Sequence, residues 1–348
     1  MAEPGVRSAA EAGVIVGIDV GGTKIAAAVV DGVEVVARVE RPTEVDGADA
    51  LLDQVAALAG EAVAEAGGGE LRAAGVGIPS QIDAASGTAL DSVNIPLTGV
   101  PVRDQLGNRL GVPVFVDNDA NCAALAEARL VPDPPADELV MLTLGTGVGG
   151  GIVIDGRIFR GATGLGAELG HIVVDGREDA PAPAGRFPRP GSLEWHCSGR
   201  GLEREATRCA RAHPESELGR RLAERGRVSG RDAVAAARAG DARASELIGA
   251  YGRWLGIGIA TVVNVFEPQR VVIGGGISEA ADLFLDAAVA EAGRWALPVL
   301  WERTTVGLAR GGADAGAIGA ALLAAHELER SGHTAKLNVQ SASDKGVG

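Results

Sequence analysis

The stretch VGIDVGGTK at residues 16–24, followed by an apolar run that ends in Asp31-Gly32, decides the fold class of this chain. A second stretch, LTLGTGVGGG at residues 142–151, is built to the same pattern and leads to Asp155-Gly156. In both, a β-branched strand enters a glycine turn, a second strand leaves it, and the Asp-Gly pair suits a type I′ turn. The repeated pattern predicts two related β-hairpins and therefore a duplicated fold.

Both glycine turns are candidate phosphate sites, because glycine leaves backbone N–H groups uncovered and such groups bind phosphate oxygens. The predicted ligands are the turn residues: Gly21, Gly22, Thr23 and Lys24 in the first turn, and Gly145, Thr146 and Gly147 in the second. Asp19 ends the strand before the first turn, where it could hold Mg²⁺ through water. Two such turns predict that a polyphosphate is bound from both sides, which points to ATP as the ligand.

Composition narrows the class of protein. The chain has 348 residues, enough for two domains, and 46% of them are hydrophobic. Its net charge of −14 disfavours nucleic acid as a partner, because the phosphate backbone is also negative. The 3 cysteines are too few for a disulfide framework and indicate a cytoplasmic protein. No apolar run is long enough to span a bilayer, so no membrane partner is expected.

Lysine is rare in this chain, and its placement is informative. Lys24, Lys336 and Lys345 are the lysines of the sequence, so the predicted folded body contains one, in the first glycine turn. A lysine at that position can meet a phosphate as a point charge.

Strands alternate with helices in the predicted order of elements, which indicates an α/β fold with two domains. We divide the chain into five segments: a flexible leader at 1–13, an N-terminal α/β domain at 14–120, a C-terminal α/β domain at 121–313, a helix at 314–330 that returns to the first domain, and a disordered tail at 331–348. Asp314 is the expected N-cap of the returning helix. A hinge between the domains would let a cleft close over substrate.

A polar cluster follows the predicted strand at 114–116, where a helix is expected to begin. It consists of Asp117, Asn118, Asp119 and Asn121, which is more than a helix cap needs. Ligands bind at the carboxyl ends of strands in open α/β sheets. We therefore predict Asp119 as the general base that takes a proton from a hydroxyl group.

Other polar residues are candidate ligands of substrate hydroxyls. Glu168 and His171 lie three residues apart with a glycine between them, so their side chains could converge on one diol. Glu194 is a third acidic candidate, and Asn94 is either a turn residue or a hydroxyl ligand. Carboxylates, amides and a histidine without an arginine clamp favour a neutral polyol over an acidic substrate.

A glycine triplet, Gly274, Gly275 and Gly276, follows a predicted buried strand. A backbone without side chains at this point can lie against a flat adenine ring. The triplet is therefore a candidate adenosine segment of the ATP site.

Together these residues resemble the ROK family of sugar kinases, the bacterial glucokinase-like group of the actin-like ATPase superfamily. The resemblance covers about residues 14–330 and rests on six motifs in order: DVGGTK at 19–24, NDAN at 118–121, LGTG at 144–147, ELGH at 168–171, EWHCSG at 194–199 and VIGGG at 272–276. It implies two related hexokinase-type, ribonuclease H-like domains around a hinged cleft, with ATP and Mg²⁺ as cofactors and a homodimer or homotetramer as the assembly. It also implies that Asp119 is the base and that five residues hold the ring hydroxyls: Asn94, Asn118, Glu168, His171 and Glu194.

One departure from the family pattern is important. Most members carry three cysteines before the glutamate of the fifth motif, and these bind structural zinc together with the ELGH histidine. The corresponding positions here hold Gly185, Phe187 and Ser192, which provide no thiolate, so no zinc is expected. A substitute site that joins His196 and Cys197 to the ELGH histidine stays an alternative.

The resemblance implies transfer of the ATP γ-phosphoryl group to a primary hydroxyl, with glucose as the default acceptor and glucose 6-phosphate as the product. An alternative is a C7-cyclitol 7-kinase acting on a substrate of the valienone or valiolone type, because loss of zinc fits a remodelled pocket. The Pro-rich stretch at 176–190 is the expected cause of such a switch. Other hexoses as acceptors and polyphosphate as donor also stay open. A ROK-type sugar-responsive repressor is disfavoured, because only 13 residues precede the first predicted strand.

Overall fold

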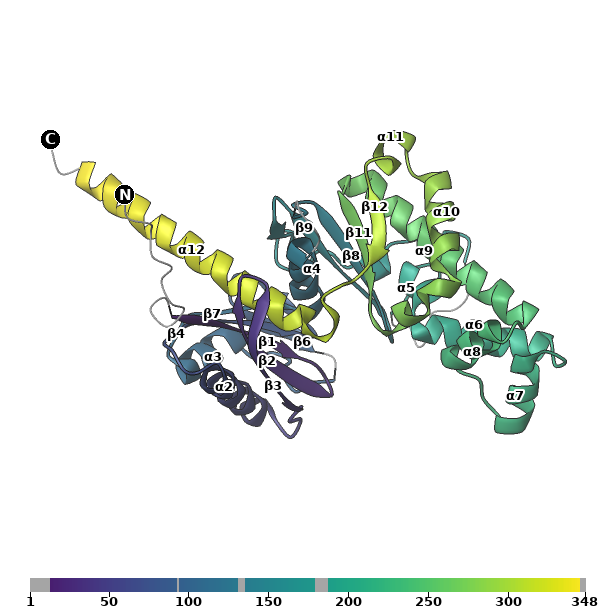
Figure 1. Cartoon of the computed structure of the whole chain (residues 1–348), viewed down its shortest axis with the longest axis horizontal. Helices are drawn as coiled ribbons and strands as arrows, with labels where there is room; N and C mark the ends of the chain where they lie inside the picture. The colour runs from purple at the N-terminus through teal and green to yellow at the C-terminus, as the bar shows by residue number, and fades with distance from the viewer. Residues whose placement is uncertain (1–12, 93, 131–134, 179–186, 345–348) are drawn as a thin grey trace. The chain divides into compact units, whose positions relative to one another are not determined.

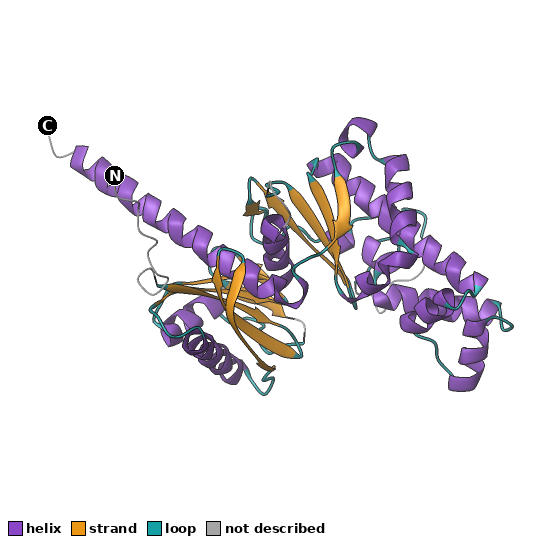
Figure 2. Cartoon of the chain, in the orientation of Figure 1, coloured by secondary structure: helices purple, strands orange, loops and turns teal. Residues whose placement is uncertain are grey.

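A computed structural model of the chain describes residues 13–92, 94–130, 135–178 and 187–344, with the backbone alone for 332–344 (Figure 1). The chain divides into two compact units. Unit 1 contains residues 1–135, 157–166 and 310–348, and unit 2 contains residues 136–156 and 167–309. Each unit is a β-sheet with helices packed on it, so the predicted α/β class is confirmed (Figure 2).

Unit 1 is built on a sheet with the strand order β3-β2-β1-β4-β7. Its strands are β1 (Val14–Val20), β2 (Lys24–Asp31), β3 (Glu34–Pro42), β4 (Leu71–Ile78) and β7 (Val114–Asn118). The first strand lies in the centre, antiparallel to β2 and parallel to β4. A separate hairpin is formed by β5 (Ser80–Asp83) and β6 (Thr88–Ser92).

One face of this sheet packs on α2 (Ala48–Glu65) and α3 (Val102–Leu110). Successive side chains of a strand point to opposite faces, so Val16, Ile18 and Val20 all enter the core on this side. The apolar alternation of the first stretch therefore determines which face of the sheet is buried under these helices.

The opposite face carries α4 (Asp119–Leu130) and α12 (Ala315–Asp344), which pack together through buried apolar side chains. Gly17 and Gly75 lie under α12. A Cβ at Gly17 would overlap the carbonyl oxygen of Ala317, and one at Gly75 would overlap another carbonyl of the same helix. Glycine at these positions lets the helix backbone rest directly on the strands.

Unit 2 repeats the sheet of unit 1, with the order β10-β9-β8-β11-β12. Its strands are β8 (Leu139–Leu144), β9 (Val148–Ile154), β11 (Arg270–Gly274) and β12 (Thr305–Leu308), and the short edge strand β10 (Arg157–Ile158) comes from the segment 157–166. Here too the first strand is central, antiparallel to the second and parallel to the fourth. Because both units share one order and one set of strand directions, the predicted duplication is confirmed.

The rest of unit 2 is mostly helical. Its helices are α5 (Leu193–Cys197), α6 (Gly199–Ala212), α7 (Glu217–Arg225), α8 (Gly230–Arg238), α9 (Ala242–Phe266), α10 (Leu285–Trp295) and α11 (Pro298–Trp301), with short 3₁₀ segments η1 (Leu169–His171) and η3 (Gly276–Leu283). Apolar side chains of α9 such as Leu255 and Ile259 share a core with Leu142 and Ile273 of the sheet. Within the described part of the chain, no helix has the length and hydropathy needed to cross a membrane.

The two predicted Asp-Gly turns behave differently. Asp155 and Gly156 both have positive φ, at 51° and 69°, as a type I′ turn requires. Asp31 instead stays in β2 and pairs with Glu34, so the turn centre is Gly32-Val33, with φ of 60° at Gly32. The type I′ prediction for the first hairpin is therefore wrong, because the strand pairing extends one residue further than expected.

The division of the chain also differs from the predicted one. Unit 1 runs to residue 135 instead of 120, because α4 packs on α12. The returning helix continues to Asp344, past the predicted end at residue 330. Asp314 lies in a short 3₁₀ segment before this helix, and its Oδ1 accepts a hydrogen bond from Arg38 Nε at 2.7 Å. Residues 1–12 of the predicted leader and residues 345–348 of the predicted tail lie outside the described residues.

Candidate functional site

The first glycine turn joins β1 to β2 in unit 1. Gly21 N donates to Lys24 O at 2.9 Å, and Thr43 Oγ1 donates to Gly21 O at 2.6 Å. Gly22 and Thr23 are exposed, and no acceptor in the described residues takes their backbone N–H groups. The turn is thus held by Thr43, the residue after β3, and leaves two N–H groups for an anion, which fits the predicted phosphate site.

Asp19 lies near the end of β1, beside this turn. The pKa of its carboxyl is raised from 3.8 to about 6, chiefly by burial and also by the nearby Asp119, while Lys24 and Arg38 oppose the rise. A Cβ at Gly316 would lie 2.5 Å from Asp19 Oδ2, so glycine at the start of α12 leaves room for the carboxylate. A confined carboxylate whose charged form is disfavoured gains from a cation, which fits the predicted water-mediated Mg²⁺ ligand.

Lys24 stands at the edge of the turn, with its side chain about half exposed. Its Nζ lies 2.9 Å from Glu40 Oε2, and Arg38 also donates to Glu40. Arg38 in turn donates to Asp314, which ties this charged group to the start of α12. Lys24 is therefore placed beside the predicted phosphate turn, with the Glu40 carboxylate paired to its ammonium group.

Asp119 is the first residue of α4, directly after β7. Burial raises the pKa of its carboxyl, while the hydrogen bond from Ala120 N, at 2.9 Å, opposes that rise. Asn118 Oδ1 accepts from Ala120 N at 2.9 Å and from Asn121 N at 3.3 Å. Asn118 therefore caps α4, and the raised pKa of Asp119 fits the predicted general base.

The sequence reasoning missed the group that holds this segment in place. Asp117 is only 3% exposed, and its Oδ2 accepts from Arg160 Nε at 2.6 Å. Its Oδ1 accepts from Asn118 N and Asn121 Nδ2, both at 2.8 Å. Asp117 is thus a positioning residue for the predicted base, and Arg160 compensates its buried charge.

Asn94 lies against the first turn, as its prediction as a site residue requires. A Cβ at Gly22 would be 3.1 Å from the Asn94 Cβ. Asn94 has a positive φ of 66°, a conformation that asparagine tolerates better than most residues. Unit 1 therefore brings together the first turn, Asp19, Asn94 and Asp119.

The second glycine turn joins β8 to β9 in unit 2. Gly145 N donates to Gly147 O at 2.9 Å, and Gly199 N donates to Gly145 O at 2.8 Å. Glu194 Oε2 accepts from Val148 N at 2.9 Å, and a Cβ at Gly147 would lie 2.6 Å from that same oxygen. Glu194, predicted as a hydroxyl ligand, is thus fixed against the predicted phosphate turn.

The remaining candidate nucleotide-binding residues are Thr146, at the tip of this turn, and the glycine triplet. Thr146 is exposed at the tip. Gly275 has φ of 84°, and a Cβ there would overlap Leu144 O. The lack of a side chain at Gly275 therefore lets the backbone pack closely against β8. Gly274 is likewise crowded, whereas a Cβ at Gly276 would meet nothing within 4 Å. Of the triplet, Gly276 presents the bare backbone that the predicted adenine contact needs.

Glu168 and His171 flank η1, which packs on β9 through Gly170. Glu168 Oε2 lies 3.8 Å from His171 Nε2, and both side chains are accessible, at 53% and 35%. Their polar atoms are therefore close enough to contact one diol, as predicted. The His171 ring also contacts the Phe187 ring, with 4.9 Å between the ring centroids.

The positions that correspond to the family's zinc ligands serve other purposes here. Phe187 packs on His171, Ser192 caps α5 by accepting from Trp195 N at 3.2 Å, and Gly185 lies outside the described residues. Cys197 is fully buried and its Sγ donates to a backbone carbonyl. No group of three or more His, Cys, Asp or Glu in the described ranges is placed to hold a metal ion, so the substitute site is not formed there.

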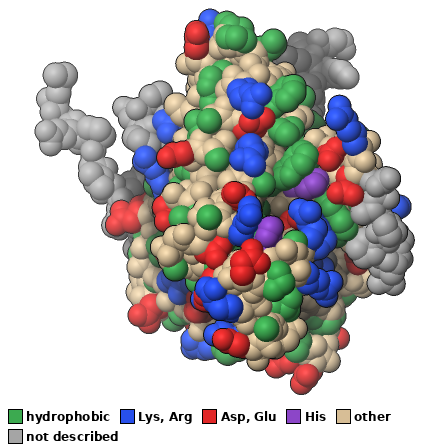
Figure 3. All heavy atoms as spheres, turned by 90° about the vertical axis from the view of Figure 1, so that its right-hand side faces the viewer, with side chains coloured by type: hydrophobic (Ala, Val, Ile, Leu, Met, Phe, Trp, Pro, Cys, Tyr) green, Lys and Arg blue, Asp and Glu red, His purple; other side chains and the backbone are tan. Residues whose placement is uncertain are grey.

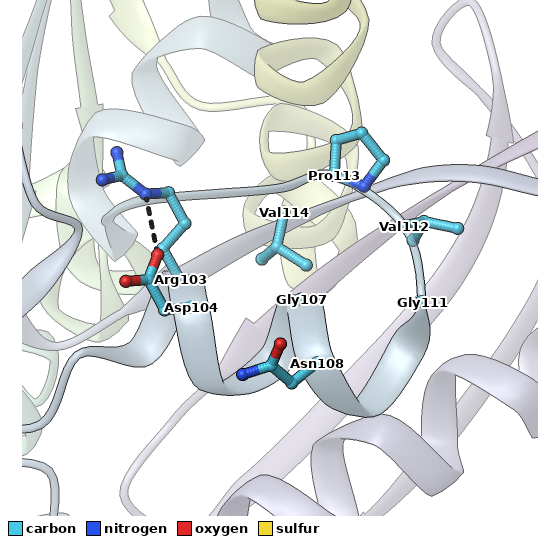
Figure 4. Close-up of a pocket in the computed structure, with 8 residues that line it drawn as sticks. All are labelled: Arg103, Asp104, Gly107, Asn108, Gly111, Val112, Pro113 and Val114. Carbon is cyan, nitrogen blue, oxygen red and sulfur yellow. Dashed lines mark ion pairs between the residues drawn. The ribbon is translucent and has the colours of Figure 1, made fainter.

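A hollow of about 800 Å³ in unit 1 lies beside α3, away from these residues (Figure 4). It is lined by Arg103, Asp104, Gly107, Asn108, Gly111, Val112, Pro113 and Val114. Its two charged side chains pair with each other at 3.7 Å. It contains no predicted site residue, and its charges compensate one another.

Comparison with known proteins shows which protein family the chain is related to. The ROK family model matches residues 15–327. A glucokinase from Halalkalibacterium halodurans is 36% identical over 311 residues, 87% of this chain and 92% of that protein. The crystal structure of a ROK hexokinase from Thermus thermophilus is similar with a TM-score of 0.77 at 36% identity, covering 91% of this chain and 99% of that one. A ROK family glucokinase from Streptomyces griseus, in complex with glucose and AMPPNP, has a TM-score of 0.69 at 34% identity, covering 90% and 100%. The matches extend through both units, and the chain belongs to the ROK family.

Proposed function

We propose that this protein is a kinase that transfers the γ-phosphoryl group of ATP to the primary hydroxyl of a neutral sugar, with glucose as the first candidate acceptor. The observation that carries the proposal is the Asp119 carboxyl, which burial makes a better proton acceptor and which lies in the same unit as the first phosphate turn. Its electrostatic coupling to Asp19 indicates that the predicted base and the predicted Mg²⁺ ligand belong to one site. The glucokinase relatives support glucose as the acceptor.

In the proposed reaction the acceptor hydroxyl oxygen forms a bond to the γ-phosphorus of ATP. The bond from that phosphorus to the bridging oxygen breaks, and ADP leaves. Asp119 accepts the hydroxyl proton as the oxygen attacks. Asp117 and Asn118 contribute by fixing the backbone from which Asp119 projects.

Phosphate binding would use the N–H groups of the two turns and the charge of Lys24. The free N–H groups of Gly22 and Thr23 suit phosphate oxygens, and the second turn offers Thr146 at its exposed tip. Asp19 would hold Mg²⁺ through water, and that ion would offset negative charge on the phosphates.

Acceptor binding would use Glu168, His171, Asn94 and Asn118, together with the Glu194 oxygen that Val148 does not occupy. Carboxylate, imidazole and amide groups bind hydroxyls as donors and acceptors, and none of them requires a charged substrate. This composition supports a neutral polyol.

A C7 cyclitol is the second candidate acceptor, and one observation favours it. Phe187 is 65% exposed while its ring packs on His171, so an apolar surface borders a predicted hydroxyl ligand. A ring that carries fewer hydroxyls than glucose, or a double bond, would contact that surface at a smaller desolvation cost.

The test is ADP release with Mg·ATP across a panel of acceptors that contains glucose, mannose, fructose, N-acetylmannosamine and valienone. The Asp119→Asn variant is the blank for background hydrolysis. Turnover on glucose that vanishes in the variant would support a glucokinase, and turnover on valienone alone would support the cyclitol kinase. Equal ADP release by both proteins with every acceptor would overturn the proposal. Size-exclusion chromatography with light scattering would test the predicted homodimer or homotetramer.

A further inference from the structure

The helix α6 of unit 2 carries a basic face in a chain of net charge −14. Figure 3 shows this end of the unit, where several Lys and Arg side chains (blue) lie close together. A hollow of about 580 Å³ along the helix is lined by Arg200, Glu203, Arg204, Thr207, Arg208 and Arg211. None of these residues belongs to the proposed kinase machinery.

The four arginines form one row, called here the arginine row. Spacings of four, four and three residues place Arg200, Arg204, Arg208 and Arg211 on one side of an α-helix. At about 1.5 Å per residue the row extends about 16 Å along the axis. It is therefore long and narrow, whereas a single phosphate ion contacts one or two guanidinium groups.

The row is held in place at its centre. The Arg204 guanidinium lies 3.7 Å from the centroid of the Trp195 ring, and its Nη2 donates to Trp195 O at 2.9 Å. Stacking on an aromatic ring fixes the plane of a guanidinium and reduces the entropy lost on binding. Arg204 is thus a preorganised donor.

The charges of the row are only partly compensated. Glu205 lies 3.3 Å from Arg204 Nε and 2.7 Å from Arg208 Nη2. Arg200 and Arg211, at the two ends, form no ion pair with any residue that the structure describes. The pKa of Arg204 is lowered, chiefly by burial and also by the positive Arg208. A bound anion would relieve this electrostatic cost.

We propose that the arginine row binds a short linear oligophosphate. Guanidinium groups match phosphate oxygens with paired hydrogen bonds, and successive phosphates can contact successive arginines. The net charge of −14 repels a long polyanion that would extend beyond the row, so a short chain of phosphates fits better than nucleic acid.

The test is isothermal titration of the whole protein with tripolyphosphate, in low salt and without ATP, Mg²⁺ or sugar. The test variant combines Arg200→Gln, Arg208→Gln and Arg211→Gln, and leaves Arg204 in place because its packing on Trp195 contributes to stability. The matched control combines Arg225→Gln, Arg243→Gln and Arg303→Gln, which removes the same charge from exposed positions elsewhere in unit 2. Thermal unfolding verifies that both variants are folded.

We expect the row variant to bind tripolyphosphate at least about tenfold more weakly than wild type, and the control within about twofold. Orthophosphate should bind more weakly than tripolyphosphate, since it contacts fewer arginines. Tripolyphosphate can also enter the proposed ATP site, so wild type should show two binding events: the row variant should lose one of them, and Lys24→Ala should weaken the other.

Four results would overturn the proposal. They are wild-type affinity in the row variant, an equal loss in the control, loss in Lys24→Ala of the same binding event that the row variant loses, and tighter binding of a single-stranded oligonucleotide than of tripolyphosphate. The row variant and Lys24→Ala affect separate binding events, so failure of this proposal is distinguishable from failure of the proposed kinase site.

Discussion

Glu194 Oε2 accepts a hydrogen bond from Val148 N at 2.9 Å, so a residue proposed to bind the acceptor is fixed to the turn proposed to bind phosphate. Under the proposed function, Glu194 would therefore contact the acceptor and also hold the second turn in place. A change at Glu194 is therefore expected to affect both substrates, and the nature of the change determines how.

Replacement of Glu194 separates these two roles. Glu194→Ala leaves Val148 N without its acceptor and frees the second turn, so the KM values for ATP and for the acceptor should both rise. Glu194→Gln keeps an amide oxygen for Val148 N, so the KM for ATP should stay within about twofold while the KM for the acceptor rises. Steady-state kinetics with each substrate varied in turn would measure both. Equal effects of the two variants on ATP would contradict the role of this hydrogen bond.

Asp119→Asn should lower kcat by about 10²- to 10⁴-fold, because the amide cannot accept the hydroxyl proton. Binding of ATP should change little, since the amide keeps the size of the side chain. Titration calorimetry with a nonhydrolysable ATP analogue gives the binding, and ADP release gives the rate. Asp104→Asn, at an exposed position of α3, is the control and should leave both unchanged.

The raised pKa of Asp19 predicts that wild type and the Asp19→Asn variant differ in stability by an amount that depends on pH. Its pKa is raised from 3.8 to about 6 in the folded protein, so folding favours the protonated carboxyl. This stabilising effect is complete below about pH 4 and is lost as pH rises through about 6. Asp19→Asn keeps a neutral side chain at every pH, and should therefore be more stable than wild type at pH 7.5, by on the order of 1 kcal/mol.

Urea denaturation of wild type and Asp19→Asn at several pH values measures this difference. The two free energies of unfolding should agree near pH 4, separate between pH 4 and 6, and stay apart above that. A constant gap across the whole range would mean that the titration of Asp19 does not cause it. The variant should also gain less stability from Mg·ATP.

Because α12 lies directly on the sheet, a side chain added at a glycine under this helix should strongly destabilise unit 1. Gly17→Ala places a Cβ on the carbonyl oxygen of Ala317 and should destabilise unit 1 by about 3 kcal/mol. Gly60→Ala is the matched control, because a Cβ at this α2 position meets nothing within 4 Å. The control should gain about 0.5–1 kcal/mol from its higher helix propensity. Thermal unfolding of the two variants against wild type would show opposite signs.

The parts of the fold that were predictable are local. Each hairpin is encoded by alternating apolar residues around a glycine turn, and both turns and their strands are where the pattern puts them. Asp119 is predicted as the base because a strand, a polar cluster and a helix follow one another within a few residues. The order of the motifs along the sequence also predicts the family, which is confirmed.

The parts that were missed depend on contacts between distant residues. Arg160 compensates the charge of Asp117 across 43 positions of sequence, and Thr43, just after β3, donates a hydrogen bond to Gly21 O. Neither contact produces a periodic pattern in the sequence from which it could be predicted. The turn at Gly32-Val33 was misplaced because the Asp-Gly rule does not report how far the strand pairing extends. Asp314 was predicted as the N-cap of α12, but its carboxylate accepts a hydrogen bond from Arg38 on β3.

The construction of unit 1 also sets an order of events on the ribosome. The face of its sheet that carries Gly17 and Gly75 is covered by α12, which is translated only after residue 309. All residues of unit 2 lie between 136 and 309, in two stretches separated by residues 157–166. During synthesis, unit 2 can therefore reach its native packing while the part of the unit 1 sheet that α12 will cover is still exposed to chaperones.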